Sequence, residues 1–331
     1  MKILVTGGAG YIGSFMVKRL IERGDEVTVL DNLKRGHREV VDAKADFHEL
    51  NLFDWDKLEE LFAQKKFDSI IHFAGFISME ESVKDPGLYF YNNTSGSLGL
   101  IEHAKRGGVK NFIFSSTAGV YGNPTEVPIP EDHPKNPVNP YGESKLMVEK
   151  ILSWFEKLNN MNYVCLRYFN ACGASLDGGM GEDHDPETHI IPKAIEAALE
   201  NKEFTLFGTD YKTTDGTCVR DYIHVLDLVE AHVLALEKLE KEGGGRIYNV
   251  GTGKGYSNKE VVEMVKKVSK VDFQVREAER RPGDADSLVA NVDKIKNELG
   301  FNPKFSDLQT IVESAWKWHE RNSKFKIQNS K

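Results

Sequence analysis

Through the first 170 residues, short apolar runs alternate with segments whose apolar positions recur at helical spacing. The apolar runs predict strands at 3–5, 27–30, 69–73, 111–115 and 163–168, and the helical segments lie at 11–23, 58–64, 88–105 and 141–158. The strands do not alternate apolar with polar residues, which is typical of a parallel sheet covered on both faces. With right-handed crossovers, this pattern predicts an α/β fold with a doubly wound parallel sheet, whose ligands bind at the carboxyl ends of the strands.

After Asn170 the pattern changes. Residues 171–187 are rich in Gly, Asp and Pro and predict a long loop, and further helices are expected at 190–199, 226–239 and 257–270. We therefore predict two domains. Residues 1–170 form the doubly wound domain, and residues 171–331 form a smaller α/β domain that binds substrate, with segment 220–250 returning to the first.

A glycine-rich turn joins the first predicted strand to the first helix. Within Thr6-Gly7-Gly8-Ala9-Gly10-Tyr11-Ile12-Gly13, the first glycine permits a tight turn, Gly10 lets the backbone approach a pyrophosphate, and Gly13 allows close packing of the helix on the sheet. The N-terminus of the helix offers free N–H groups and a partial positive charge to that anion. The alternative is a turn that the fold needs only for packing.

Asp31 ends the second predicted strand, where its carboxylate can accept hydrogen bonds from the ribose hydroxyls of an adenosine. The same carboxylate would repel a 2′-phosphate, so the segment predicts NAD in preference to NADP. Arg35 and Arg38 follow closely in the sequence and could weaken this discrimination.

Tyr141 and Lys145 lie four residues apart at the start of a predicted helix and therefore share one face. A free tyrosine has a pKa of about 10, and a nearby ammonium group favours its phenolate. Such a pair can take a proton from an alcohol while a nicotinamide ring takes a hydride. Thr117 follows the strand at 111–115 and could hydrogen-bond the reacting oxygen. A tyrosine–lysine pair is usually a surface pair, but its position after a dinucleotide-binding turn favours catalysis.

Composition excludes several classes of function. The chain has 331 residues, with 43 Lys and Arg against 51 Asp and Glu, and its net charge of −8 argues against nucleic acid as a partner. No apolar run approaches the roughly 18 residues of a membrane span. The three cysteines contain no CxxC pair, which excludes a disulfide framework and indicates the reducing cytoplasm. His184 is expected in a solvated loop without a second ligand group at suitable spacing, so no metal site is predicted.

With these elements in place, the chain resembles the extended short-chain dehydrogenases/reductases, and among them the UDP-glucose 4-epimerase family. The resemblance runs from Met1 to about Trp318. It rests on TGGAGYIG from Thr6, DNL from Asp31, HFAG from His72, NN at Asn92, SSTAGVYG from Ser115, NPYGESKLMVE from Asn139, LRYFNACGA from Leu166, DGTCVRDYIHVLDL from Asp215, YNVGTG from Tyr248 and RRPGD from Arg280.

The resemblance assigns residues to the coenzyme and to the catalytic group. It implies an NAD site formed by Gly7, Gly10, Tyr11 and Ile12 at the pyrophosphate, Asp31 and Asn32 at the adenosine ribose, Asn51 and Leu52 at the adenine, and Phe73, Ala74, Gly75, Asn92, Ser115, Tyr141, Lys145 and Tyr168 along the rest of the coenzyme. The family usually has Asp where this chain has Asn51. Tyr141 would be the base, Lys145 would tune it, and Thr117 would assist.

On the substrate side, the resemblance implies contacts to a UDP-sugar. Thr117 and Tyr141 would meet the sugar, Asn170, His189 and Ile190 the diphosphate and uridine, Phe207 and Tyr222 the uracil, Arg220 and Arg281 the diphosphate, and Asp284 the uridine ribose. Leu288 would lie at the wall of the sugar pocket, where some relatives have a tyrosine.

The implied activity is inversion at C4 of a UDP-hexose through a transient 4-keto sugar. Alternatives are an epimerase for UDP-N-acetylhexosamines or UDP-glucuronate, a dehydratase or reductase, and a non-catalytic NAD-binding protein. Dehydratases usually carry Asp-Glu after the threonine, where this chain has Ala118-Gly119. The resemblance also implies a homodimer, which apolar side chains on two helices could form: Leu98, Leu100, Leu146, Met147 and Trp154. These side chains could instead belong to the core.

Overall fold

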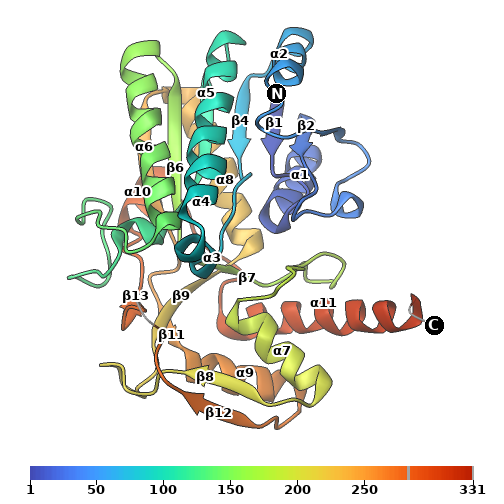
Figure 1. Cartoon of the computed structure of the whole chain (residues 1–331), viewed down its shortest axis with the longest axis vertical. Helices are drawn as coiled ribbons and strands as arrows, with labels where there is room; N and C mark the ends of the chain where they lie inside the picture. Colours follow the sequence, from blue (N-terminus) through green and yellow to red (C-terminus); the bar gives the residue numbers. More distant parts are fainter. Residues whose placement is uncertain (282–283, 330–331) are drawn as a thin grey trace.

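Seven parallel strands form the main sheet of the computed structural model, which describes residues 1–281 and 284–329 (Figure 1). Their order is β10-β6-β5-β4-β1-β2-β3. The strands are β1 (Lys2–Thr6), β2 (Glu26–Asp31), β3 (Asp46–Glu49), β4 (Ser69–His72), β5 (Asn111–Thr117), β6 (Asn162–Tyr168) and β10 (Gly245–Val250). The predicted doubly wound α/β fold is confirmed. Pro282 and Gly283, in the RRPGD stretch, lie outside the described residues.

Neighbouring residues of each central strand point to opposite cores. Ile3 and Val5 pack with one set of helices, and Leu4 between them packs with the other. One face is covered by α1 (Tyr11–Arg23), α8 (Val225–Glu242) and α10 (Asp293–Leu299), and the other by α2 (Trp55–Gln64), α5 (Gly96–Arg106) and α6 (Pro140–Asn159). Because both faces are buried, successive positions in the middle of these strands are mostly apolar. Within the described ranges, no helix combines the length and apolarity that crossing a membrane requires.

A smaller assembly lies beyond the carboxyl ends of β1 and β4, in the lower half of Figure 1. Its strands are β7 (Asn170–Cys172), β9 (Val219–His224), β11 (Gly255–Ser257) and β13 (Ser287–Leu288) in one sheet, and β8 (Phe204–Phe207) and β12 (Val275–Ala278) in another. Three helices, α7 (Ile190–Glu200), α9 (Asn258–Ser269) and α11 (Leu308–Asn329), enclose its core. A cavity lined by residues of both assemblies, among them Gly10 and Trp318, lies at the strand ends where a doubly wound sheet binds its ligands.

The predicted helix at 88–105 is interrupted in the structure. Short helices α3 (Met79–Lys84) and α4 (Pro86–Tyr89) lead into a π-helical segment, η2 (Phe90–Ser95), before α5 begins. A π-turn holds one more residue than an α-turn and rotates the side chains that follow it. Two short 3₁₀ turns, η1 (Arg38–Val40) and η3 (Ala118–Tyr121), complete the elements.

A buried ion pair clamps α6 to the sheet. Arg167 on β6 donates through Nε (2.9 Å) and Nη2 (2.6 Å) to the two carboxylate oxygens of Glu149 on α6. The exposed fractions of the two side chains are 1% and 3%. Ser116 on β5 donates to the same carboxylate at 2.5 Å, and the Tyr121 hydroxyl accepts from Arg167 at 2.8 Å. The clamp fixes the helix on which Tyr141 and its lysine partner lie.

Candidate active site

The turn between β1 and α1 is so tight that only glycine fits at two positions. Gly7 has a φ of +73°, and a Cβ atom there would lie 2.6 Å from the backbone nitrogen of Ala74. A Cβ atom at Gly13 would lie 2.1 Å from the carbonyl oxygen of Gly7. Helix α1 begins at Tyr11, and its N-cap, Gly10, has no side chain to cap the first N–H groups. The turn therefore offers those groups and the positive end of the helix dipole to a phosphate.

Tyr11 and Ile12, both predicted to hold the pyrophosphate, leave this turn in different directions. The Tyr11 hydroxyl donates to the carbonyl oxygen of Gly173 at 2.6 Å, which ties the turn to the loop after β7. Ile12 is half-buried against the core of the sheet. A cavity opens in front of the turn, and Gly10, Tyr11 and Arg35 are among the residues that line it.

Asp31 lies at the end of β2, beside the glycine turn. Its carboxylate accepts the backbone N–H groups of Ala9 (3.0 Å) and Leu33 (2.9 Å). Burial raises the pKa of Asp31, and these hydrogen bonds oppose the rise. The carboxylate is thus held at the strand end where an adenosine ribose would be expected.

The two arginines after Asp31 have partners within the chain. The Arg35 guanidinium donates to both carboxylate oxygens of Glu81, at 2.8 and 3.0 Å. The Arg38 guanidinium lies 4.3 Å from the centre of the Phe47 ring. These contacts restrain both side chains and favour the predicted preference for NAD.

Asn32, Asn51 and Leu52 lie at the same edge of the sheet as Asp31. The backbone N–H of residue 50, just after β3, donates to the Asp31 carbonyl oxygen at 3.0 Å. The side-chain oxygen of Asn32 accepts the N–H of residue 34, and that of Asn51 accepts the N–H of Phe53, both at 3.1 Å. Leu52 is buried. Both amides therefore stabilise local turns next to the predicted adenine position.

Phe73, Ala74 and Gly75 continue from β4 toward the centre of the site. The N–H of Phe73 donates to the carbonyl oxygen of residue 6 at 2.9 Å, which keeps this segment beside the glycine turn. A Cβ atom at Gly75 would lie 3.2 Å from Oδ1 of Asn93 and 3.5 Å from Nζ of Lys145. The absence of a side chain at Gly75 thus brings the backbone close to the lysine.

The sequence prediction named Asn92 as a coenzyme contact, and the structure adds the neighbouring Asn93 to this part of the site. Asn93 is buried, its Oδ1 accepts the N–H of Phe76 (2.8 Å), and its Nδ2 donates to the Phe76 carbonyl (3.0 Å) and to Ser144 Oγ (3.2 Å). The Asn92 amide donates to Asn93 Oδ1 at 3.0 Å. Asparagine has a low helix propensity, so two adjacent asparagines within a predicted helix were the available signal that this segment departs from a regular α-helix.

The first turn of α6 brings Tyr141 and Lys145 to the end of β5. Asn139 caps the helix by accepting an N–H from its first turn at 2.9 Å. Lys145 Nζ donates to the carbonyl oxygen of Ser115 at 2.9 Å, and Thr117, two residues further along β5, hydrogen-bonds Tyr141. The structure therefore brings the three predicted catalytic side chains together.

Burial governs the protonation of these groups. It raises the pKa of the Tyr141 phenol, and the hydrogen bond with Thr117 opposes this rise. Burial also lowers the pKa of Lys145 to about 8. The hydroxyl of Tyr168 lies 2.5 Å from Nε2 of His232, and burial raises the pKa of Tyr168. A lysine that titrates near neutral pH, on the same helix face as a buried phenol, suits a site that takes up and returns one proton.

Four predicted substrate residues line one cavity in the smaller assembly. They are Ile190, Phe207, Arg281 and Asp284. The Arg281 guanidinium lies 4.3 Å from the centre of the Phe207 ring. The cavity thus combines an aromatic face, on which a base can stack, with a guanidinium that can bind an anion.

The remaining substrate residues lie on the sheet centred on β9. Asn170 pairs with Tyr222 and Leu288 pairs with Arg220 in the strand register. Asn170 Nδ2 donates to the carbonyl oxygen of residue 221 at 3.1 Å. Arg220 donates to two backbone carbonyls at 2.9 Å each, and its Nη2 lies 3.6 Å from Asp284. Arg220 and Asp284 are therefore partners of each other in this structure.

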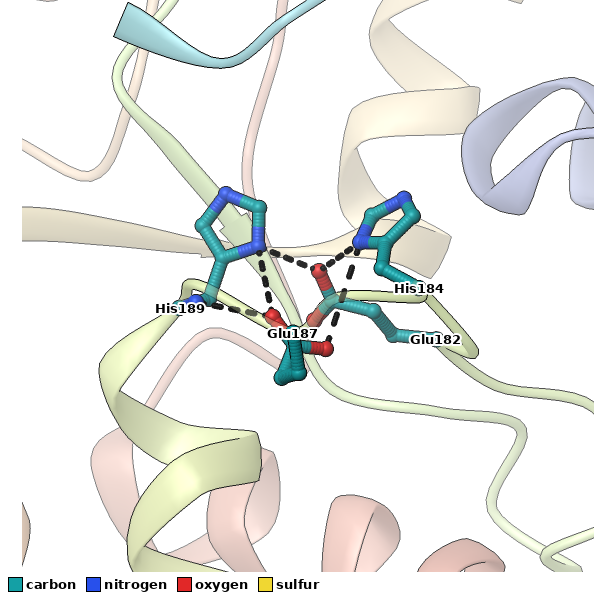
Figure 2. Close-up of side chains that lie close together, drawn as sticks. All are labelled: Glu182, His184, Glu187 and His189. Carbon is teal, nitrogen blue, oxygen red and sulfur yellow. Dashed lines mark hydrogen bonds and ion pairs between the residues drawn. The ribbon is translucent and has the colours of Figure 1, made fainter. Parts of the chain in front are cut away.

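His189 belongs to a different group of side chains. Figure 2 shows that Glu182, His184, Glu187 and His189 converge in the loop before α7. The exposed fraction of the Glu182 side chain is 4%, and that of His184 is 23%. The prediction that His184 lies alone in a solvated loop is therefore wrong. The loop is partly buried because it packs against α11, where the Trp318 indole donates a hydrogen bond to the Glu182 carbonyl oxygen at 2.9 Å.

Comparisons with known proteins agree with this geometry. Residues 3–251 match the NAD dependent epimerase/dehydratase family. The chain is 46% identical to the UDP-glucose 4-epimerase of Lactobacillus helveticus, over 98% of each chain. It superposes with a TM-score of 0.92 on the UDP-glucose 4-epimerase from Brucella ovis in complex with NAD, at 42% identity, over 95% of this chain and 97% of that one.

A further solved structure shows the range of sugars among similar proteins. The UDP-Glc/GlcNAc 4-epimerase of Campylobacter jejuni superposes with a TM-score of 0.85, at 42% identity, over 97% of this chain and 99% of that one. The resemblance that the sequence motifs indicated is confirmed. The chain therefore belongs to the NAD dependent epimerase/dehydratase family and, within it, to the UDP-glucose 4-epimerases.

Proposed function

We propose that this chain inverts the configuration at C4 of a UDP-hexose, interconverting UDP-glucose and UDP-galactose with a bound NAD. The observation that carries the proposal is the convergence of Thr117, Tyr141 and Lys145 next to the glycine turn at Gly7. When bound there, NAD supplies a reversible acceptor for the hydride of C4. The residues Gly10, Asp31, Gly75 and their neighbours at the strand ends would hold it.

In this proposal, Tyr141 is the base. Its phenolate removes the proton of the 4-hydroxyl, Thr117 hydrogen-bonds the same oxygen, and the Lys145 ammonium stabilises the phenolate. The resulting 4-keto sugar turns about its diphosphate link and presents its other face, and Tyr141 then returns the proton. This requires tight binding of the nucleotide and weak binding of the sugar. Contacts to the UDP, which is remote from C4, supply the tight binding. The cavity lined by Phe207 and Arg281 is suited to binding the UDP.

Formation of UDP-glucose from UDP-galactose without added NAD tests the proposal. Because hydride returns to the sugar in each turnover, the purified chain should remain active after dialysis and should release NAD on denaturation. A chain that carries NAD but leaves both UDP-sugars unchanged would refute the substrate assignment. Finding NADP in the site would refute the role of Asp31.

We infer that Leu288 influences which sugars are accepted. Leu288 is half-buried and packs against a cluster that includes Ala118 and Leu146, next to the catalytic threonine. A leucine leaves more room than a tyrosine, so UDP-N-acetylgalactosamine should also be turned over. One such contact changes discrimination by about 1–3 kcal/mol. Comparing kcat/KM for UDP-galactose and UDP-N-acetylgalactosamine in wild type and Leu288→Tyr tests this. Equal rejection of the acetylated sugar by both proteins would contradict it.

We also propose a homodimer formed by the outer faces of α5 and α6, which lie side by side (Figure 1). Leu98, Met147 and Trp154 are exposed on these faces, with exposed fractions of 39%, 36% and 61%. Leu100 and Leu146, also predicted for the interface, are buried in the core, so their assignment is wrong. Large exposed apolar patches usually mark interaction surfaces. Light scattering should give a dimer for wild type and a monomer for Trp154→Asp, and a monomeric wild type at micromolar concentration would contradict the dimer.

We further propose that the chain works in the reducing cytoplasm. Its three cysteines, Cys165, Cys172 and Cys218, are buried and unpaired, which is typical of proteins that do not need disulfides. Cell fractionation tests this, and recovery with secreted or periplasmic proteins would contradict it.

A further inference from the structure

The loop before α7 carries the same short pattern twice. Glu182 and His184 are separated by one residue, as are Glu187 and His189. In the structure the two patterns face each other, so that two carboxylates and two imidazoles point toward a common centre (Figure 2). One ligand atom from each side chain lies within 4.8 Å of all the others.

The separations between these atoms match a metal site. Nδ1 of His184 and Nδ1 of His189 lie 3.0 and 2.7 Å from Oε1 of Glu182. They lie 4.0 and 3.3 Å from the carboxylate oxygens of Glu187. Zn²⁺ binds nitrogen and oxygen ligands tetrahedrally at about 2.0–2.2 Å, which places neighbouring ligand atoms about 3.3 Å apart. The observed separations fall on both sides of this value.

A second observation concerns the two imidazole nitrogens. Nδ1 of His184 and Nδ1 of His189 are both buried, and neither has a hydrogen bond of acceptable geometry, although carboxylate oxygens are nearby. Within the described part of the chain, they are the buried side-chain polar atoms that lack such a partner. Both ring nitrogens therefore lie beside the Glu182 carboxylate, at 3.0 and 2.7 Å, without meeting it in hydrogen-bond geometry, and face the space shared with Glu187. A lone pair aimed at a cation accounts for this orientation.

Charge supports the same conclusion. The exposed fractions of the Glu182 and Glu187 side chains are 4% and 6%. Two carboxylates buried side by side are costly unless positive charge compensates them. A divalent cation would balance both carboxylates while leaving the two imidazoles neutral, the form in which histidine binds metals.

We propose that Glu182, His184, Glu187 and His189 form a tetrahedral binding site for a divalent cation of the Zn²⁺ class. The His184 ring packs edge-to-face on Tyr11 of the glycine turn, with centroids 6.4 Å apart, and the Glu182 carbonyl is held by Trp318 of α11. His189 is the N-cap residue of α7. The cation would thus fasten the loop between the phosphate-binding turn of the main sheet and the first turn of α7, as a structural site.

The test measures metal binding to the full chain after treatment with a chelator. Zn²⁺ alone is titrated by calorimetry, and Co²⁺ alone by visible spectroscopy, which distinguishes tetrahedral from octahedral coordination. We expect one equivalent per chain, a tetrahedral Co²⁺ spectrum, and a higher Tm in the presence of Zn²⁺. Because no UDP-sugar or activity is involved, the result is independent of the proposed epimerase function.

Three variants define the ligands. His184→Ala and Glu187→Gln each remove one proposed ligand, and Asp185→Asn removes an exposed carboxylate of the same loop as a matched control. Loss of residues that only orient metal ligands weakens binding about 10–100-fold, so loss of a ligand should cost at least about tenfold. The control should bind like wild type.

Two outcomes would overturn the proposal. One is wild-type protein that takes up neither metal stoichiometrically, which would leave an ion-paired histidine–glutamate network. The other is binding of equal strength in wild type, His184→Ala and Glu187→Gln, which would mean adventitious sites elsewhere. Circular dichroism verifies that the variants are folded, and the wild-type Co²⁺ spectrum decides the coordination geometry without any variant.

Discussion

Replacing Tyr141 by Phe removes one hydroxyl from the centre of the site and keeps the ring. The ring packs with Phe76 and Tyr89, with an edge-to-face centroid distance of 6.4 Å to Tyr89, and phenylalanine preserves these contacts. The loss in stability should be that of one hydrogen bond with Thr117, about 1 kcal/mol. The loss in turnover should be at least about a hundredfold, or about 2.7 kcal/mol of transition-state stabilisation, because the general base is gone.

The matched control is Tyr89→Phe. Tyr89 is fully buried beside Tyr141, and its hydroxyl donates to the Glu81 carboxylate at 2.9 Å, so the chemical change is the same and the lost hydrogen bond is at least as strong. Turnover is measured as UDP-glucose formed from UDP-galactose, and stability by urea denaturation. Tyr89→Phe should lose at least as much stability as Tyr141→Phe, and only Tyr141→Phe should lose its turnover while still binding UDP. If the two variants turn over equally fast, Tyr141 is not the base.

Further predictions concern other groups on the same elements. Burial lowers the pKa of Lys145 to about 8, so its ammonium is present below that pH and lost as the pH rises through it. Turnover should therefore fall on the alkaline side, and Lys145→Arg, which keeps its charge, should flatten that limb of the pH–kcat profile. Asp31→Asn should fold but lose its NAD on dialysis, and NAD content equal to wild type after denaturation would refute the ribose contact. Arg167→Met should lower the free energy of unfolding by about 3–5 kcal/mol in urea, because Glu149 stays buried without its partner. Adding Glu149→Leu should recover part of that loss, and no recovery would argue against the ion pair as the cause.

Features that depend on neighbours in the chain could be predicted from the sequence alone. The glycine turn is such a feature, because the positive φ of Gly7 and the close contact between Gly13 and Gly7 arise within seven residues. Tyr141 and Lys145 share a face of α6 because helical spacing places residues i and i+4 together. Five of the seven strands of the main sheet were equally clear, since burial on both faces makes their middle positions mostly apolar. The polar strand β3 and the distant strand β10 were not predicted.

Other features depend on contacts between distant segments. The rotation of Asn93 toward Phe76 and Ser144 follows from a π-turn that helical periodicity does not reveal. Likewise, apolar spacing alone could not separate Leu100, which is buried, from Leu98, which is exposed on the same helix. Packing against neighbouring elements decides which side of a helix is covered.

The histidine–glutamate cluster is the clearest example of a feature that depends on contacts between distant segments. The sequence contains all four side chains within eight residues, but a loop without regular periodicity has many possible conformations, and spacing does not say which side chains converge. Convergence requires the contacts of that loop with Tyr11 on α1 and Trp318 on α11, more than 130 residues away on either side. Local sequence patterns therefore determined five strands of the sheet, the glycine turn and the Tyr141–Lys145 pair. Only tertiary packing, which closes long loops against distant elements, decided where the four side chains of Figure 2 meet.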